Sequence, residues 1–177
     1  MDFNPYAFVV SVDIEPEMLK QLKKRLGKNR LKKTQPVKTD LLSFLEKTSS
    51  SSIDGVASAM TIHNFSDEYR EKLVREIFRA LRAGGVFVNA DKYYPKEKSL
   101  QKKLSEKHIK IVCGNYAKIG RADLADGWKA HFKEDERPGR VFVKEDFVKL
   151  LKKTGFKNIT LKKIAGLHMV LIAKKSK

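Results

Sequence analysis

An alternation of short apolar runs with leucine-spaced stretches constrains the fold of this chain most. Residues 8–12 read FVVSV and end in an acid, and leucines recur every three or four residues from residue 19 to residue 26. The same change of period recurs at residues 35–47 and again at residues 53–81. Strand-like runs that alternate with helical stripes are typical of a parallel sheet with covering helices. The sequence therefore predicts an α/β fold with a mostly parallel sheet and helices on both faces.

Turn and cap residues set the expected bounds of the elements in the first half of the chain. The expected strands are residues 8–12, 35–39, 53–59 and 85–91. A first helix should begin at Pro16 and stop near Gly27, and residues 41–47 should form a short helical turn. Ser66 is the expected N-cap of a longer helix, which the sequence RAGG should end through a glycine in the left-handed conformation.

The second half of the chain shows a less regular pattern that becomes clear again at its end. Residues 96–112 look helical, residues 113–132 look helical in pieces, and the sequence KEDERPGR at 133–140 is typical of a loop. A helix over residues 144–154 should stop at Gly155. Two apolar runs around the turn at residues 165–166 then predict an antiparallel strand pair that closes the sheet edge.

Length and residue usage indicate one intracellular domain. A chain of 177 residues with 41% hydrophobic residues suffices for one domain with a core, over residues 1–177. The single cysteine excludes an internal disulfide, and the four histidines show no metal-ligand spacing, so we expect no metal site. No apolar stretch approaches a membrane span, and the first residues lack the plan of a signal peptide. These observations predict a soluble, cytoplasmic protein without membrane contact.

The charge of the chain is strongly positive and allows two interpretations. There are 38 Lys and Arg against 21 Asp and Glu, a formal net charge of +17. Clustered cations bind nucleic acid through counterion release, so RNA is one candidate partner. A lysine-rich solvated surface without a polyanion partner is the other interpretation, and it also accounts for the basic residues at 20–33.

Two acids stand where predicted parallel strands end. Asp13 follows the first apolar run and Asp40 follows the second. In open α/β sheets ligands bind outside the carboxyl ends of the strands, and a carboxylate there can accept hydrogen bonds from both hydroxyls of a ribose. An aspartate at the end of a strand is also an ordinary helix N-cap, so each residue alone has a purely structural alternative.

The order of these segments resembles a known family. The segments VVSVDIEPEML, VKTDLL, IDGVASAMTIHNFSDEYREKLVREIFRALRAGGVFVNAD, FVKEDFVKLLKKTGFKNITLKKI and HMVLIAKK together resemble the class I S-adenosylmethionine-dependent methyltransferases. Residues 108–177 also show a faint resemblance to carboxy-S-adenosylmethionine synthases, which act in tRNA wobble-uridine modification. The resemblance implies a Rossmann-like sheet and methyl transfer from S-adenosylmethionine to an acceptor, a small molecule or RNA.

Positions that match the family pattern imply roles for individual residues. Asp13 would bind the ribose hydroxyls of the cofactor and Ile14 would lie against the adenine. Asp40 would lie near the adenine amino group, and Leu41 would supply a backbone contact. The resemblance places the remaining positions at the methionine end of the cofactor (Ala59, Met60), facing the substrate (His63, Asn64), or in a variable substrate cap near residues 95–143 (Tyr93, Tyr94, Asn115, Trp128).

The chain departs from the family pattern at its beginning. In the family a strand, a glycine-rich loop and a helix precede the strand that ends in Asp13, whereas seven residues precede Phe8 here and no G-x-G occurs. We therefore expect an N-terminally truncated form of the domain, either a fragment, a product of a misplaced start site, or a natural short form. The exposed strand edge could be covered by a second copy in a homodimer.

Two functions from different classes fit these observations. The first is a methyltransferase, complete or inactive, which predicts binding of S-adenosylmethionine. The second is a non-catalytic basic RNA-binding or assembly module that keeps the methyltransferase fold. The second function predicts salt-dependent RNA binding without affinity for the cofactor.

Overall fold

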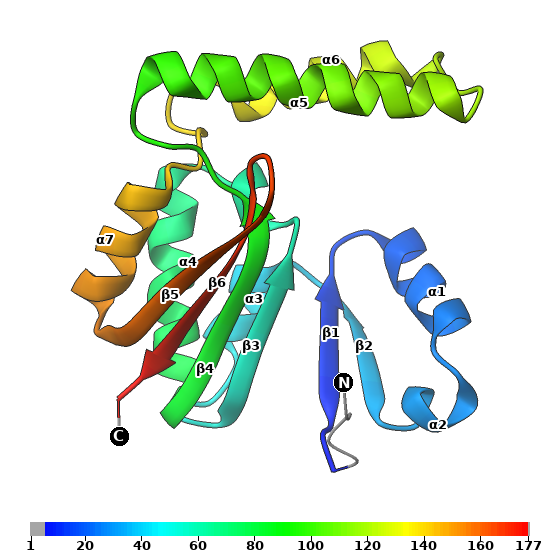
Figure 1. Cartoon of the computed structure of the whole chain (residues 1–177). Coiled ribbons are helices and arrows are strands. Elements are labelled where there is room, and N and C mark those ends of the chain that lie inside the picture. Colours follow the sequence, from blue (N-terminus) through cyan, green and yellow to red (C-terminus); the bar gives the residue numbers. More distant parts are fainter. Residues whose placement is uncertain (1–5, 177) are drawn as a thin grey trace. The chain divides into compact units, whose positions relative to one another are not determined.

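A computed structural model describes residues 6–176 of the chain, which divides into two compact units, Met1–Ser49 and Ser50–Lys177 (Figure 1). The elements of the first unit are β1 (Val9–Asp13), α1 (Pro16–Arg25), α2 (Lys28–Leu31), β2 (Thr34–Lys38) and α3 (Leu41–Glu46). The elements of the second unit are β3 (Ile53–Ala59), η1 (Ile62–Asn64), α4 (Asp67–Ala80), β4 (Leu81–Lys92), α5 (Lys98–Lys118), α6 (Leu124–Asp135), α7 (Lys144–Thr154), β5 (Phe156–Ala165) and β6 (His168–Lys175).

The first unit is built on a parallel pair of strands. β1 pairs with β2 from Val9 opposite Thr34 to Asp13 opposite Lys38. Pro16 opens α1, as the sequence predicted, because its missing N–H needs no partner in a first helical turn. The carboxyl ends of parallel strands lie at the same edge, so this unit brings Asp13 and the start of α3 together at one edge.

The second unit contains a four-stranded sheet in the order β3-β4-β6-β5. β3 and β4 are parallel, whereas β6 pairs antiparallel with both β4 and β5. This arrangement confirms the α/β class with an antiparallel C-terminal strand pair. The described strands nevertheless form two sheets rather than one, because no strand within residues 6–176 pairs with both β1 and β3.

Helices α4 and α7 lie side by side against one face of the four-stranded sheet, and α5 and α6 run across the end at which β3 and β4 finish (Figure 1). The core lies between the sheet and these two covering helices, where Phe156 packs edge-on against Phe78 with ring centroids 5.0 Å apart. The fully buried apolar residues of this core include Leu73, Val74, Ile77, Leu81, Phe87, Leu151, Phe156 and Leu171.

The predicted end of the fourth helix was wrong by several residues. α4 ends at Ala80, and RAGG lies within β4 instead of forming a glycine cap. The reason is Leu81, which is fully buried and already has the extended backbone of a strand. Gly84 does adopt a positive φ of 76°, but it does so inside β4, beside a shift in the β3–β4 register.

The loop predicted at residues 133–140 also begins later than expected. α6 continues to Asp135, whose side chain is buried against Lys92. Burial of that ion pair extends the helix into a polar stretch that looks like a loop in the sequence. The prediction of α7, in contrast, is confirmed at both ends, and Gly155 follows it with a left-handed φ of 115°. None of the helices described between residues 6 and 176 is both long and apolar enough to cross a membrane.

Candidate active site

A buried histidine and a buried aspartate meet at the carboxyl ends of β3 and β4. His63 lies in η1 directly after β3, and its Nδ1 is 2.5 Å from Oδ1 of Asp91 near the end of β4. The two strands are adjacent and parallel, so their ends bring these side chains to the same edge. A carboxylate can only accept hydrogen bonds, so Nδ1 is the donor in this contact, and the tautomer with its proton on Nδ1 carries a lone pair on Nε2.

Asp91 also orders the backbone that carries this histidine. Its Oδ2 accepts hydrogen bonds from the N–H groups of Ile62 at 3.0 Å and His63 at 3.3 Å. Its Oδ1 accepts a further bond from the N–H of Lys92 at 2.8 Å. The carboxylate therefore fixes both the imidazole and its loop, which is the arrangement a proton-accepting histidine needs.

Arg70 of α4 also holds this loop, through its carbonyl oxygens. Its Nε donates to the carbonyl oxygen of Ile62 at 3.2 Å, and its Nη2 donates to that of His63 at 3.0 Å. Nη2 also donates to the carbonyl oxygen of Arg140, while Nη1 bonds Oδ1 of Asp67 at 2.7 Å. Burial lowers the pKa of the Arg70 guanidinium, and the charge of Asp67 opposes that shift. Arg70 is a positioning residue for His63.

A cavity of about 220 Å³ lies beside the dyad of His63 and Asp91. Nε2 of His63 is 3.8 Å from Oδ2 of Asp135, which in turn is 2.6 Å from Nζ of Lys92. The rings of Trp128 and Phe132 on α6 stack at 5.1 Å. The residues that line the cavity come from the end of β3, η1, β4, α5 and α6: Met60, His63, Asn64, Lys92, His108, Trp128, His131, Phe132 and Asp135.

The residues expected to face the substrate divide into two pairs. His63 and Asn64 line the cavity, as does Met60, whose backbone has a positive φ of 51° and whose N–H donates to the carbonyl oxygen of Ala90. Tyr93 and Tyr94 do not line it, because only 2% and 1% of their surfaces are exposed. Tyr93 stacks on Phe142 at 4.6 Å, and Tyr94 packs against Phe132. Burial raises the pKa of both hydroxyls, so these tyrosines belong to the core.

The residues expected to bind the adenosine lie in the first unit. Oδ1 of Asp13 accepts a hydrogen bond from the N–H of Glu15 at 2.9 Å, and Ile14 beside it is 61% exposed. Asp40 is the N-cap of α3, since its Oδ2 accepts from the N–H of Ser43 at 2.9 Å. Asp40 is therefore an N-cap, and its role near the adenine stays a prediction. Leu41 is the first residue of α3, so its backbone lies at the helix start.

Several residues of this site escaped the sequence reasoning. Asp91 could have been found, since it ends an apolar run just as Asp13 and Asp40 do. Asp135 gave no such signal, because it lies in a charged stretch of α6 and only the fold buries it. The four histidines are far apart in the sequence, yet three of them line one cavity. The described residues hold no group of three His, Cys, Asp or Glu side chains suited to a metal ion.

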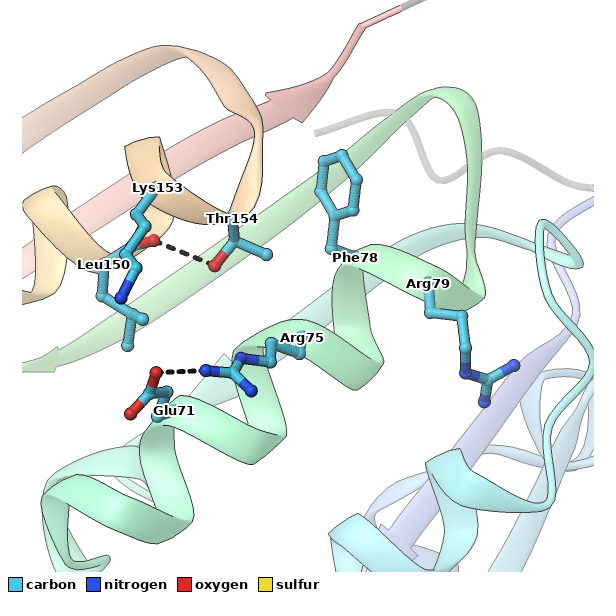
Figure 2. A pocket seen from close by; sticks show the side chains of 7 residues that line it. All are labelled: Glu71, Arg75, Phe78, Arg79, Leu150, Lys153 and Thr154. Atoms are coloured by element: carbon cyan, nitrogen blue, oxygen red, sulfur yellow. Dashed lines mark hydrogen bonds and ion pairs between the residues drawn. The ribbon is translucent and has the colours of Figure 1, made fainter.

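A second hollow, of about 290 Å³, lies between α4 and α7 (Figure 2). Within α4, Arg75 pairs with Glu71, and Nε of Arg79 donates to Glu76 at 2.8 Å. Nη1 of Arg79 also donates to the hydroxyl of Ser50 at 3.0 Å. The hydroxyl of Thr154 donates to the carbonyl oxygen of Leu150. This second hollow lies along the two helices rather than at the strand ends, and none of the residues that line it is a buried titratable group. We therefore assign the candidate site to the cavity beside His63.

His108 of the cavity and His168, whose ring lies 5.2 Å from that of His108, predict a fall in stability at acidic pH. Burial, with the charges of His168 and Lys92, lowers the pKa of His108 to about 4. Burial also lowers the pKa of His168. Between pH 6.5 and 4 the unfolded chain binds more protons at these rings than the folded chain does, so the free energy of unfolding decreases as the pH falls. Urea denaturation at pH 7 and pH 5 should show a smaller loss for His108→Gln than for the unaltered chain. Equal losses would contradict the assignment of the effect to His108.

Comparison with known proteins identifies the family. The family model of the methyltransferase domain matches residues 2–89, which include β1 to β3, η1, α4 and most of β4. The chain belongs to the class I S-adenosylmethionine-dependent methyltransferase family. A comparison with curated proteins gives no match.

Solved methyltransferase structures share the fold. Human N-acetylserotonin methyltransferase in complex with S-adenosylmethionine is 15% identical, with a TM-score of 0.61 over 98% of this chain and 42% of that one. An S-adenosylmethionine-dependent methyltransferase from Archaeoglobus fulgidus is 14% identical, with a TM-score of 0.61 over 94% of this chain and 75% of that one. A Burkholderia thailandensis 1,6-didemethyltoxoflavin-N1-methyltransferase is 16% identical, with a TM-score of 0.57 over 95% of this chain and 61% of that one.

The chain is shorter than most of these structures. It spans about half of the length of several of the solved structures that it matches, with shares of 54%, 42% and 52%. At identities near 15% the likeness establishes the methyltransferase fold alone.

Proposed function

We propose that this methyltransferase-family chain binds S-adenosylmethionine and serves methyl transfer to an acceptor whose proton is taken by His63. The observation that carries the proposal is the buried His63–Asp91 dyad beside a cavity, at the carboxyl ends of two parallel strands. Ligands of open α/β sheets bind outside these strand ends. A histidine held by a carboxylate there is suited to accept a proton at Nε2.

The residues assigned to the adenosine are compatible with that role. Asp13 uses Oδ1 within its own turn, and Oδ2 has no hydrogen bond among the described residues, so it can accept from a ribose hydroxyl. Ile14 offers an exposed apolar side chain for the adenine. Asp40 and Leu41 follow the neighbouring strand in the same unit, as the family pattern requires. The family pattern assigns Ala59 and Met60 to the methionine end of the cofactor, and Met60 lines the cavity.

Methyl transfer requires little acid–base catalysis beyond one proton transfer. When bound, S-adenosylmethionine supplies a methyl group on an already activated sulfonium, so alignment matters most. His63 takes the proton of the acceptor at Nε2, and Asp91 stabilises the imidazolium that results. A positioned base of this kind contributes roughly 10²–10⁴-fold to a rate.

Binding of S-adenosylhomocysteine, measured by calorimetric titration, tests the proposal through Asp13. Asp13→Asn should weaken binding at least about tenfold, because a hydrogen bond to a charged group contributes about 1.5–3 kcal/mol. Asp54→Asn is the matched control, since Asp54 is an exposed β3 residue paired with Arg82. It should leave the affinity unchanged.

Absence of binding at millimolar ligand would contradict the proposal. If an oligonucleotide then bound with an affinity that falls steeply with salt, the net charge of +17 would instead support the RNA-binding module.

A further inference from the structure

We propose that the acceptor is a small aromatic ring carrying a hydroxyl group, stacked on Trp128 with its O–H directed to Nε2 of His63. The inference rests on the proposed function for the methyl transfer itself, whereas ring binding can be tested without the cofactor.

One wall of the cavity is flat and aromatic. The rings of Trp128 and Phe132 stack with an interplanar angle of 29°, and the His108 ring lies 5.6 Å from Trp128. Met60, on β3's side of the cavity, is 50% exposed and adds a flexible apolar surface. Aromatic rings prefer offset stacking at centroid separations of about 4.5–7 Å, so a planar ligand gains more from this wall than a saturated one of equal size.

Two polar atoms of the cavity are hydrogen-bond acceptors, so a ligand that donates hydrogen bonds fits them best. Nδ1 of His63 is occupied by Asp91, which leaves Nε2 with its lone pair. Oδ1 of Asn64 is buried and has no hydrogen-bond partner among the described residues. Both are acceptors, and a ligand with O–H groups satisfies them.

The charged groups of the cavity argue against a phosphorylated ligand. Lys92 is buried and lies 2.6 Å from Asp135, and its Nζ also lies 4.4 Å from the centre of the Phe132 ring. Lys92 and Asp135 therefore neutralise each other. An anionic phosphate in the cavity would have to displace Asp135 from its ammonium partner, at the cost of a buried unpaired carboxylate.

The size of the cavity limits the acceptor to one or two rings. Its volume is about 220 Å³, and an apolar cavity of roughly 150 Å³ is enough to bind benzene. A single substituted ring or two fused rings therefore fit.

The transfer step balances with the groups named. The ring hydroxyl gives its proton to Nε2 of His63, and its oxygen forms the new bond to the methyl carbon. The bond between that carbon and the sulfonium sulfur breaks, and its electron pair stays on sulfur as a neutral thioether.

Trp128 is the only tryptophan of the chain, so its fluorescence reports directly on the proposed wall. Titration with catechol should quench the emission to saturation. Anisole, which has the ring without an O–H, and cyclohexane-1,2-diol, which has hydroxyls without an aromatic ring, should each bind at least about tenfold more weakly. Equal binding of catechol and cyclohexane-1,2-diol would overturn the proposal.

A pair of variants tests the wall independently of fluorescence. Trp128→Leu should weaken catechol binding, measured by calorimetry, about tenfold, because stacking on an indole is lost. Tyr69→Leu removes an aromatic side chain of α4 that does not line the cavity, and it should keep the affinity of the unaltered chain. Circular dichroism of both variants confirms that they are folded. Unchanged affinity in a folded Trp128→Leu variant would overturn the proposal.

Two further outcomes separate this inference from its alternatives. Catechol binding without any binding of S-adenosylhomocysteine would support the ring site while refuting methyl transfer by this chain. Displacement of catechol by a single-stranded oligouridine, at concentrations far below the dissociation constant of catechol, would overturn the inference. A base within RNA would then be the occupant of the cavity.

Discussion

Replacement of Asp91 by Asn is expected to lower the free energy of unfolding by about 3–5 kcal/mol. Asp91 is 1% exposed, and its two oxygens accept from the N–H groups of Ile62, His63 and Lys92 and from the imidazole of His63. In the variant an NH₂ group replaces one of these oxygens and faces donors instead of an acceptor. Urea denaturation measures the change. A decrease in the free energy of unfolding below about 1 kcal/mol would show that the carboxylate does not stabilise this loop.

Asp54→Asn is the matched control for this substitution. Asp54 pairs with Arg82 on the surface, where its side chain is 80% exposed, so the loss should stay below about 1 kcal/mol. The ¹⁵N shifts of the His63 ring give a second readout, since Asp91→Asn removes the acceptor that keeps the proton on Nδ1. If the chain transfers methyl groups, its rate should fall about 10³–10⁴-fold, as expected for a base held in the wrong tautomer.

Replacement of Gly155 by Ala is expected to lower the free energy of unfolding by about 2–5 kcal/mol. Gly155 ends α7 with a φ of 115°, which side chains of L-residues rarely adopt. A Cβ atom there would lie 2.8 Å from Cζ of Phe78. That ring packs edge-on against Phe156 and cannot move away freely. The cost of the strained backbone and the cost of overpacking therefore add.

Gly127→Ala provides the control of opposite sign. Gly127 lies within α6, and a Cβ atom added there meets nothing within 4 Å. Alanine in a helix interior is favoured over glycine, so this variant should be more stable by about 0.5–1 kcal/mol. Thermal and urea unfolding of the two variants, measured side by side, check both signs. A stable Gly155→Ala variant would contradict the close approach of Phe78.

The bounds of helices and strands were predicted best where local residue preferences and burial favour the same structure. α7 was predicted at both ends because a helical stripe is followed by a glycine that the chain needs at positive φ. β3 was predicted over its full length, since its apolar run is bounded by polar turns. The end of α4 was mispredicted, because burial of Leu81 overrides the turn preference of the glycines that follow.

The candidate site was predictable only in part. An acid at the end of an apolar run indicates a strand end, and the rule that selected Asp13 and Asp40 applies equally to Asp91. The pairing of Lys92 with Asp135 joins residues 43 positions apart, and no local pattern encodes it. Tyrosine is a common residue at binding surfaces, so the sequence alone could not assign Tyr93 and Tyr94. Their packing against Phe142 and Phe132 shows that they belong to the core.

Arg70 ties the loop of the proposed base to the segment that follows the α5–α6 helix pair. Its guanidinium bonds the carbonyl oxygens of Ile62 and His63 and also that of Arg140, and the N–H of Asp67 donates to the carbonyl oxygen of Gly139. A displacement of residues 139–140 therefore shifts the imidazole of His63 as well. If the helix pair moves when a ligand enters, we expect the loop of His63 to move with it, so the proposed proton transfer would depend on the arrangement of residues 139–140 described above. A lysine in place of Arg70 could not preserve this coupling, since one ammonium group cannot span the same carbonyl oxygens in a fixed plane.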